Sequence, residues 1–170
     1  AGPRGAPPRD GPPGEPAASS AEPVLPPRVV GTERCVLQGL LGRLIPGSAV
    51  LETIAPADFQ VPGHRRVAEL FWQYHETDEP IRRILEVVGA DDALVSSVIS
   101  GLVAEQEKRP VTTKMVEESV NAIKERRLKA RIAELQSQLA RPDLPASEER
   151  TRMEKELREL VKELSDRRAG

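Results

Sequence analysis

The stretch TTKMVEESVNAIKERRLKARIAELQSQLA, residues 112–140, decides the fold of this 170-residue chain. Thr112 or Thr113 can cap a helix, and neither Gly nor Pro follows before Pro142, so the stretch predicts one helix of about 29 residues and about 43 Å. Its apolar residues form two stripes that differ in phase by one residue, which indicates packing against two partners in turn. The stripes are Val116, Val120 and Ile123, then Leu128, Ile132, Leu135 and Leu139.

A second striped helix follows the break at residues 141–146. Ser147 can cap it, and its apolar face begins at Met153. Because a short connection makes two such helices antiparallel neighbours, we predict a C-terminal helical hairpin over residues 127–168. We expect the internal seam of this hairpin to contain Leu128, Ile132, Leu135, Leu157, Leu160 and Leu164.

The predicted hairpin has little apolar surface for its length. Two helices bury too little to offset the conformational entropy lost on folding, so we expect a partner, or docking on the rest of the chain, to complete it. The stripes should face inward, and we therefore expect contact residues at the loop end. Our hypothesis for the partner-binding residues is Leu139, Arg141, Leu144 and Met153.

The middle of the chain predicts a compact helical bundle over residues 30–109. Apolar residues recur there at helical spacing between Pro and Gly breaks, and Thr32 and Asp91 are candidate helix caps. The segment 94–103 is apolar over so much of its girth that we expect it at the centre of the bundle. Residues 110–126 would form the connecting part of the long helix. The predicted fold class is thus all-α: a compact bundle, a long connecting helix and an antiparallel hairpin.

The N-terminal segment differs in composition from the rest. Nine of the sixteen prolines lie in the first 27 residues, so we interpret residues 1–29 as a disordered Pro/Gly-rich linker. A lone Cys35 excludes an internal disulfide. Neither a signal peptide nor an apolar run of membrane-spanning length is present, so we expect a cytoplasmic protein without membrane contact.

Charge is distributed unevenly. Residues 32–107 carry 6 basic and 12 acidic side chains, giving −6, whereas residues 108–170 carry 16 and 12, giving +4. The densest basic run is KERRLKAR, residues 124–131. No aromatic residue follows Tyr74, and Glu125 interrupts the run, so weak nucleic-acid contact is a secondary hypothesis. An acidic protein surface is at least as good a target.

No motif for catalysis stands out. The stretch GRLIPGS, residues 42–48, has the glycine spacing of a phosphate-binding loop, but Ser48 replaces its lysine. His64 and His75 lack ligand partners at helical spacing, and we interpret both as surface or boundary residues. The carboxylates at 76–79 are explained by a helix start. We therefore assign no catalytic residue, no metal ligand and no cofactor to this fragment.

The order of these features resembles a known module. TERCVLQGLLGRLIPGSAVLETIAPADFQVPGHRRVAELFWQY, residues 32–74, is similar to the helical module shared by the C-terminal domain of bacterial DNA primase and the N-terminal domain of the replicative helicase. The similarity includes an acidic-Phe-x-x-Pro-x-His-Arg entry to a helix. Here the entry residues are Asp58, Phe59, Pro62, His64 and Arg65.

The C-terminal half favours primase over helicase. NAIKERRLKARIAELQSQLA and EERTRMEKELRELVKEL resemble the terminal hairpin of the primase domain, and the Pro-rich start resembles the linker to its catalytic part. A helicase chain would continue toward an ATPase domain with a GxxxxGK[ST] loop, whereas this one ends at Gly170. The resemblance covers residues 30–168.

This resemblance implies a helicase-binding domain. Its hairpin would dock on the helicase N-terminal domains, so that primers are made where the duplex opens. The full-length parent would be a DNA primase, a DNA-dependent RNA polymerase and nucleotidyltransferase, whose zinc-binding and polymerase parts have no counterpart here. The fragment itself should not be an enzyme.

Two alternatives stay open: an N-terminal assembly domain of a replicative helicase, and a nucleic-acid-binding helical protein. The sequence also leaves open whether the hairpin packs on the bundle, extends from it, or swaps between two copies through the long helix.

Overall fold

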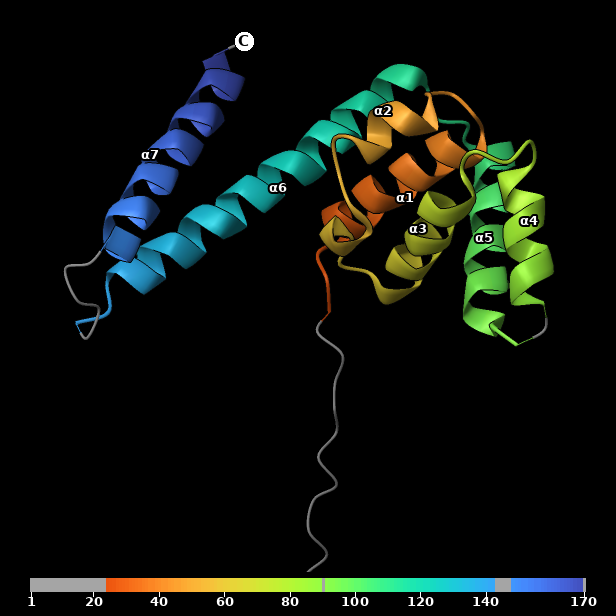
Figure 1. The fold of residues 1–170 in the computed structure, drawn as a ribbon. Helices are drawn as coiled ribbons and strands as arrows, with labels where there is room; N and C mark the ends of the chain where they lie inside the picture. Colours follow the sequence, from red (N-terminus) through yellow and green to blue (C-terminus); the bar gives the residue numbers. More distant parts are fainter. Residues whose placement is uncertain (1–23, 90, 143–147, 170) are drawn as a thin grey trace, which may run out of the picture.

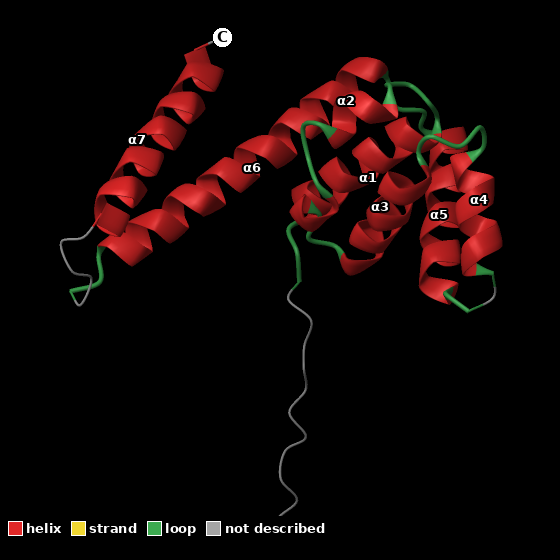
Figure 2. Cartoon of the chain, in the orientation of Figure 1, coloured by secondary structure: helices red, strands yellow, loops and turns green. Residues whose placement is uncertain are grey.

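The computed structural model describes residues 24–89, 91–142 and 148–169, and these ranges are helical without a strand (Figures 1 and 2). The predicted all-α class is confirmed. The helices are α1 (Pro27–Leu41), α2 (Gly47–Leu51), the 3-10 helix η1 (Pro56–Asp58), α3 (Pro62–Tyr74), α4 (Pro80–Val88), α5 (Ala93–Lys108), α6 (Thr113–Leu139) and α7 (Glu148–Ala169).

Helices α1 to α5, with η1, surround one apolar core and are called the bundle below. The aromatic residues that the sequence places close together also meet in space. Phe59 is fully buried, and its ring centroid lies 6.3 Å from that of Trp72 in an edge-to-face arrangement. Trp72 stands in the same relation to Phe71. Such pairs add a directional contact to the aliphatic core.

The start of the bundle differs from the prediction. Helix α1 begins at Pro27, so the predicted linker boundary at residue 29 is wrong by part of a turn; residues 1–23 lie outside the described ranges. Proline suits a first helical position because the backbone N–H it lacks would have no partner there. Thr32 is not a cap but lies inside the helix, where its hydroxyl donates to the carbonyl of Arg28 at 2.8 Å.

Two of the other predicted caps fall within the described residues. Thr112 caps α6, as predicted, because its hydroxyl accepts from the backbone N–H of Met115 at 3.3 Å. The cap of α5 is Asp92 rather than Asp91, and its carboxylate accepts from the N–H of Val95 at 3.1 Å. The prediction of a capping aspartate before this helix is confirmed, but its position was wrong by one residue.

The expectation that segment 94–103 occupies the centre of the bundle is wrong. Helix α5 packs against α1, α3 and α4, but Leu94 and Val103 are 53% and 44% exposed. The central helix is α1, which packs on α3, α5 and α6. Its buried face includes the polar residues Glu33 and Gln38, which lower its apolar content and concealed its central position.

Helix α6 packs on α1 with its first half and on α7 with its second. Val116, Val120 and Ile123 are buried against the bundle. Gly39 lets α1 and α6 approach closely, because an added Cβ there would lie 2.6 Å from Cγ1 of Val116. Figure 1 shows α6 leaving the bundle and α7 lying beside its far half. None of the described helices combines the length and apolar character needed to cross a bilayer.

Candidate protein-interaction site

The segments 128–139 of α6 and Glu148–Ala169 of α7 are called the hairpin. Leu135 is fully buried and Leu128 nearly so, and neither belongs to the apolar core of the bundle. The other predicted seam residues are half-buried, namely Ile132, Leu157, Leu160 and Leu164. The hairpin thus has one well-covered apolar seam on α6 and a more open face on α7.

A bidentate ion pair joins the two helices of the hairpin. Arg131 Nε and Nη2 donate to the two oxygens of Glu156 at 2.8 and 3.1 Å, and Arg131 Nη1 donates to Glu134 at 2.9 Å. The hydrogen bond from Arg131 lowers the pKa of Glu156, and that with Glu156 raises the pKa of Arg131. Since two parallel bonds require one relative placement of the groups, this pair favours one register of α7 on α6.

Three of the four predicted partner-binding residues lie within the described ranges. Leu139 is the last residue of α6 and is half-buried, Arg141 follows it and is exposed, and Met153 is half-buried in α7. Leu144 and the predicted cap Ser147 fall outside the described residues. An exposed apolar residue that this prediction did not include is Val161, on α7, which is 46% exposed.

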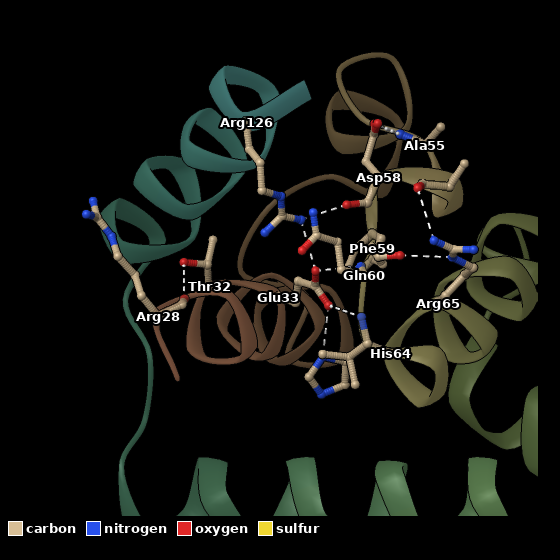
Figure 3. Close-up of polar contacts among 12 residues, drawn as sticks. Arg28, Thr32, Glu33, Ala55, Asp58, Phe59, Gln60, His64, Arg65 and Arg126 are labelled. Atoms are coloured by element: carbon tan, nitrogen blue, oxygen red, sulfur yellow. Dashed lines mark hydrogen bonds and ion pairs between the residues drawn. The ribbon is translucent and has the colours of Figure 1, made fainter. Parts of the chain in front are cut away.

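A buried carboxylate lies where α6 leaves the bundle. Glu33 of α1 is fully buried, and its Oε1 accepts from the backbone N–H of Gln60 at 2.7 Å and from Nη2 of Arg126 at 2.9 Å (Figure 3). Its Oε2 accepts from the N–H of Val61 at 3.1 Å and lies 3.3 Å from Nδ1 of His64. One carboxylate therefore links α1, the entry to α3 and α6.

Asp58 provides a second set of acceptors beside Glu33. Its carbonyl accepts from Nη2 of Arg126 at 2.7 Å, and its Oδ2 accepts from Nη1 of Arg127 at 3.0 Å. The same Oδ2 also accepts from the N–H of Ala55 at 2.8 Å, which closes the turn of η1. We call the five residues Glu33, Asp58, His64, Arg126 and Arg127 the Glu33 cluster.

The cluster keeps Glu33 ionised despite its burial. Loss of solvent by itself raises the pKa of this carboxyl, but hydrogen bonds from His64, Gln60 and Val61 and the charge of Arg126 together hold the pKa below its ordinary value of 4.5. His64 is buried, so the interpretation of this histidine as a surface or boundary residue is wrong. Its partner is Glu33, 31 residues earlier, which no local spacing reveals.

Sequence reasoning missed Glu33, Arg126 and Arg127 as structural residues. One signal was present: Glu33, Leu37 and Leu40 share one helical face at spacings of four and three. A carboxylate in line with a buried apolar face requires a partner of opposite charge. The two arginines carry no such mark, because they lie within a basic run that resembles a solvated face.

The basic run 124–131 is neutralised within the described structure. Each of its five cations lies within 4.0 Å of a carboxylate oxygen. The pairs are Lys124 with Glu163, Arg126 with Glu33, Arg127 with Asp58, Lys129 with Glu125, and Arg131 with Glu156. Little free positive charge is left there for phosphate groups.

Within the described ranges, no group of three or more His, Cys, Asp or Glu side chains is placed to hold a metal ion. Comparison with protein-family models, curated proteins and solved structures gives no match to the chain.

Proposed function

We propose that this chain is a helicase-binding domain similar to the C-terminal domain of bacterial DNA primase. The hairpin would dock on the N-terminal domains of the replicative helicase, recruit primase to the fork for primer synthesis and modulate helicase activity. One observation carries the proposal: α7 packs mainly on α6, and the hairpin extends away from the bundle (Figure 1).

Partial burial of α7 supports a binding role. Its apolar stripe includes Leu157, Leu160 and Leu164, each only half-buried, and Val161 is exposed. A helix with one neighbour keeps part of its apolar stripe in water, and a partner that covers this stripe gains the free energy of its burial. We place the docking surface on the hairpin because α7 packs mainly on α6, whereas the apolar side chains that the bundle also exposes, such as Leu94 and Val103, lie on a helix with three neighbours.

The proposal assigns binding and no catalysis to these residues. Polymerisation would belong to the full-length primase that the sequence resembles, and we propose no cofactor for the fragment. A cytoplasmic location follows from a role in replication rather than from any targeting signal.

Both alternatives make different physical predictions. A helicase assembly domain would form a stable ring or dimer, and a swapped dimer through α6 would also sediment as a dimer. A nucleic-acid-binding protein would lose affinity steeply with added salt. The pairing of all five cations in the run 124–131 argues against the second alternative.

A matched pair of valines tests the proposal. Val161 on α7 and Val103 on α5 are 46% and 44% exposed, so Val161→Glu and Val103→Glu place the same charge at equally exposed helical positions. We expect Val161→Glu to weaken binding to the cognate helicase N-terminal domains by about tenfold or more, because a charge would enter the interface. Val103→Glu should bind as the parent does. Equal affinities for both variants would contradict the proposal.

A further inference from the structure

We infer that Arg126 and Arg127 are positioning residues that set the direction in which the hairpin leaves the bundle. Their contacts with Glu33 and Asp58 are called the arginine contact below. What this direction does for partner binding rests on the proposed function, whereas the positioning itself does not depend on any partner.

The arginine contact lies at the boundary between bundle and hairpin. The last apolar residue of α6 in the bundle core is Ile123, and the first residue of the hairpin seam is Leu128. Between them, Arg126 and Arg127 make three hydrogen bonds to two residues of the bundle. The acceptors belong to α1 and to the end of η1, so one turn of α6 is held from two elements.

These bonds add a directional restraint to the apolar packing of α6. Apolar contacts tolerate rolling and sliding of a helix, whereas a planar guanidinium holds its acceptors in fixed directions. Nη2 of Arg126 donates both to the carboxylate of Glu33 and to the carbonyl of Asp58, at 2.9 and 2.7 Å. A change in the tilt or roll of α6 at this turn would break at least one of the two bonds.

The arginine contact is separable from the folding of the bundle. Without Arg126, the carboxylate of Glu33 keeps its contacts with Gln60, Val61 and His64. Without Arg127, Asp58 keeps its bond to Ala55. Neither carboxylate loses all its donors, so removing the two arginines leaves the bundle's own polar contacts in place and acts mainly on α6.

A hairpin held at one angle has a consequence for binding. A partner that docks on it need not offset the loss of orientational freedom, since the bundle has already imposed it. Releasing the arginine contact would therefore reduce affinity without removing any residue from the docking surface itself.

Distances between two spin labels test the positioning. Ser100 on α5 and Lys162 on α7 are exposed, and each is replaced by a labelled cysteine in the full chain, with the buried Cys35 changed to Ala. We expect a single narrow distance distribution in the parent. In Arg126→Met/Arg127→Met, the distribution should broaden and its maximum should shift. An unchanged distribution would overturn the inference.

A matched variant separates positioning from a general loss of charge. Arg66→Met removes a guanidinium that pairs with Glu69 and Asp92 inside the bundle, and it should leave the distance distribution unchanged. Far-UV circular dichroism reports whether each variant keeps its helices. If Arg126→Met/Arg127→Met fails to fold, Arg126→Lys/Arg127→Lys takes its place, because it keeps both charges but loses the planar geometry. A parent-like distribution in that folded variant would equally overturn the inference.

The distance measurement contains no helicase, so it tests the positioning role independently of the proposed function. A chain that ignores the helicase, yet shows a broadened distribution when the arginines are removed, would refute the proposed function and support the positioning role. If the chain binds the helicase equally well with and without the arginine contact, and the distance distribution is also unaltered, the positioning role is refuted and the proposed function is supported.

Discussion

Nη2 of Arg126 in α6 donates to Oε1 of Glu33 in α1 at 2.9 Å, and this bond joins residues that lie 93 positions apart in the chain. Glu33 is fully buried in the central helix of the bundle, and Arg126 lies two residues before the hairpin seam begins at Leu128. A single ion pair therefore connects the centre of the bundle with the helix that carries the proposed docking element.

Glu33→Ala should destabilise the bundle strongly. The substitution leaves the N–H groups of Gln60 and Val61 without their acceptor and removes the carboxylate that pairs with Arg126, so the free energy of unfolding should fall by about 2–4 kcal/mol. Glu69→Ala is the control, because Glu69 is exposed and pairs with the exposed Arg66. Urea unfolding measures both. Similar losses for the two variants would argue against a special role of the buried carboxylate.

The depressed pKa of Glu33 predicts how stability depends on pH. The pKa of the Glu33 carboxyl is lower in the folded state than its ordinary value of 4.5. Its ionised form therefore contributes to the free energy of unfolding above pH 4.5, and this contribution is lost as the pH falls toward the folded-state pKa. Glu33→Gln has no such proton to gain. The stability difference between parent and variant should narrow as urea unfolding is repeated at decreasing pH below 4.5. A constant difference would show that Glu33 does not titrate with folding.

Gly39 and Gly101 should respond oppositely to alanine. At Gly39 of α1 an added Cβ would lie 2.6 Å from Cγ1 of Val116, and this β-branched side chain cannot move aside, so Gly39→Ala should cost about 1–3 kcal/mol. At Gly101 of α5 nothing lies within 4 Å of the added atom, so Gly101→Ala should stabilise by about 0.5–1 kcal/mol. Thermal unfolding of the two variants and the parent measures both changes in stability.

A second substitution checks the cause of the loss at Gly39. Val116→Ala creates room for the new methyl group, so the cost of Gly39→Ala should be smaller in that background. If Gly39→Ala lowered the free energy of unfolding equally in both backgrounds, its contact with Val116 would not be the cause of the loss.

Charge reversal in the hairpin should loosen α7 selectively. Arg131→Glu places a carboxylate beside Glu134 and Glu156, so amide hydrogen exchange should speed up in α7 while α1 and α3 stay protected. Exchanging the charges in Arg131→Glu/Glu156→Arg should restore part of the protection. Faster exchange throughout the bundle would mean that α7 does not unfold as a separate unit.

The local pattern predicted the helices better than it predicted their neighbours. The stretch 112–140 predicted α6 and its cap, because apolar periodicity and a capping threonine are properties of consecutive residues. The central position of α1 was missed, since Glu33 and Gln38 interrupt its apolar face. The groups that satisfy the buried Glu33 lie at residues 60, 61, 64 and 126, far from it in the sequence.

The wide apolar surface of α5 led to a wrong prediction of a central position. Apolar periodicity shows which face of a helix is buried, but it does not show how many other helices surround it. Leu94 and Val103 are as apolar as residues of a central helix, but they are 53% and 44% exposed. The roles of Arg126 and Arg127 could not be predicted either, because a basic run has the same appearance whether its charges are solvated or paired across the fold.

Isothermal titration calorimetry with the cognate replicative helicase tests the central claim most directly. The intact chain and a chain that ends at Arg127 are each titrated against the helicase N-terminal domains; the shorter chain keeps the core and the arginine contact. The account predicts saturable binding by the intact chain, no binding by the shorter one, and a folded bundle in both by circular dichroism. Equal affinity of the two chains for the helicase would contradict it.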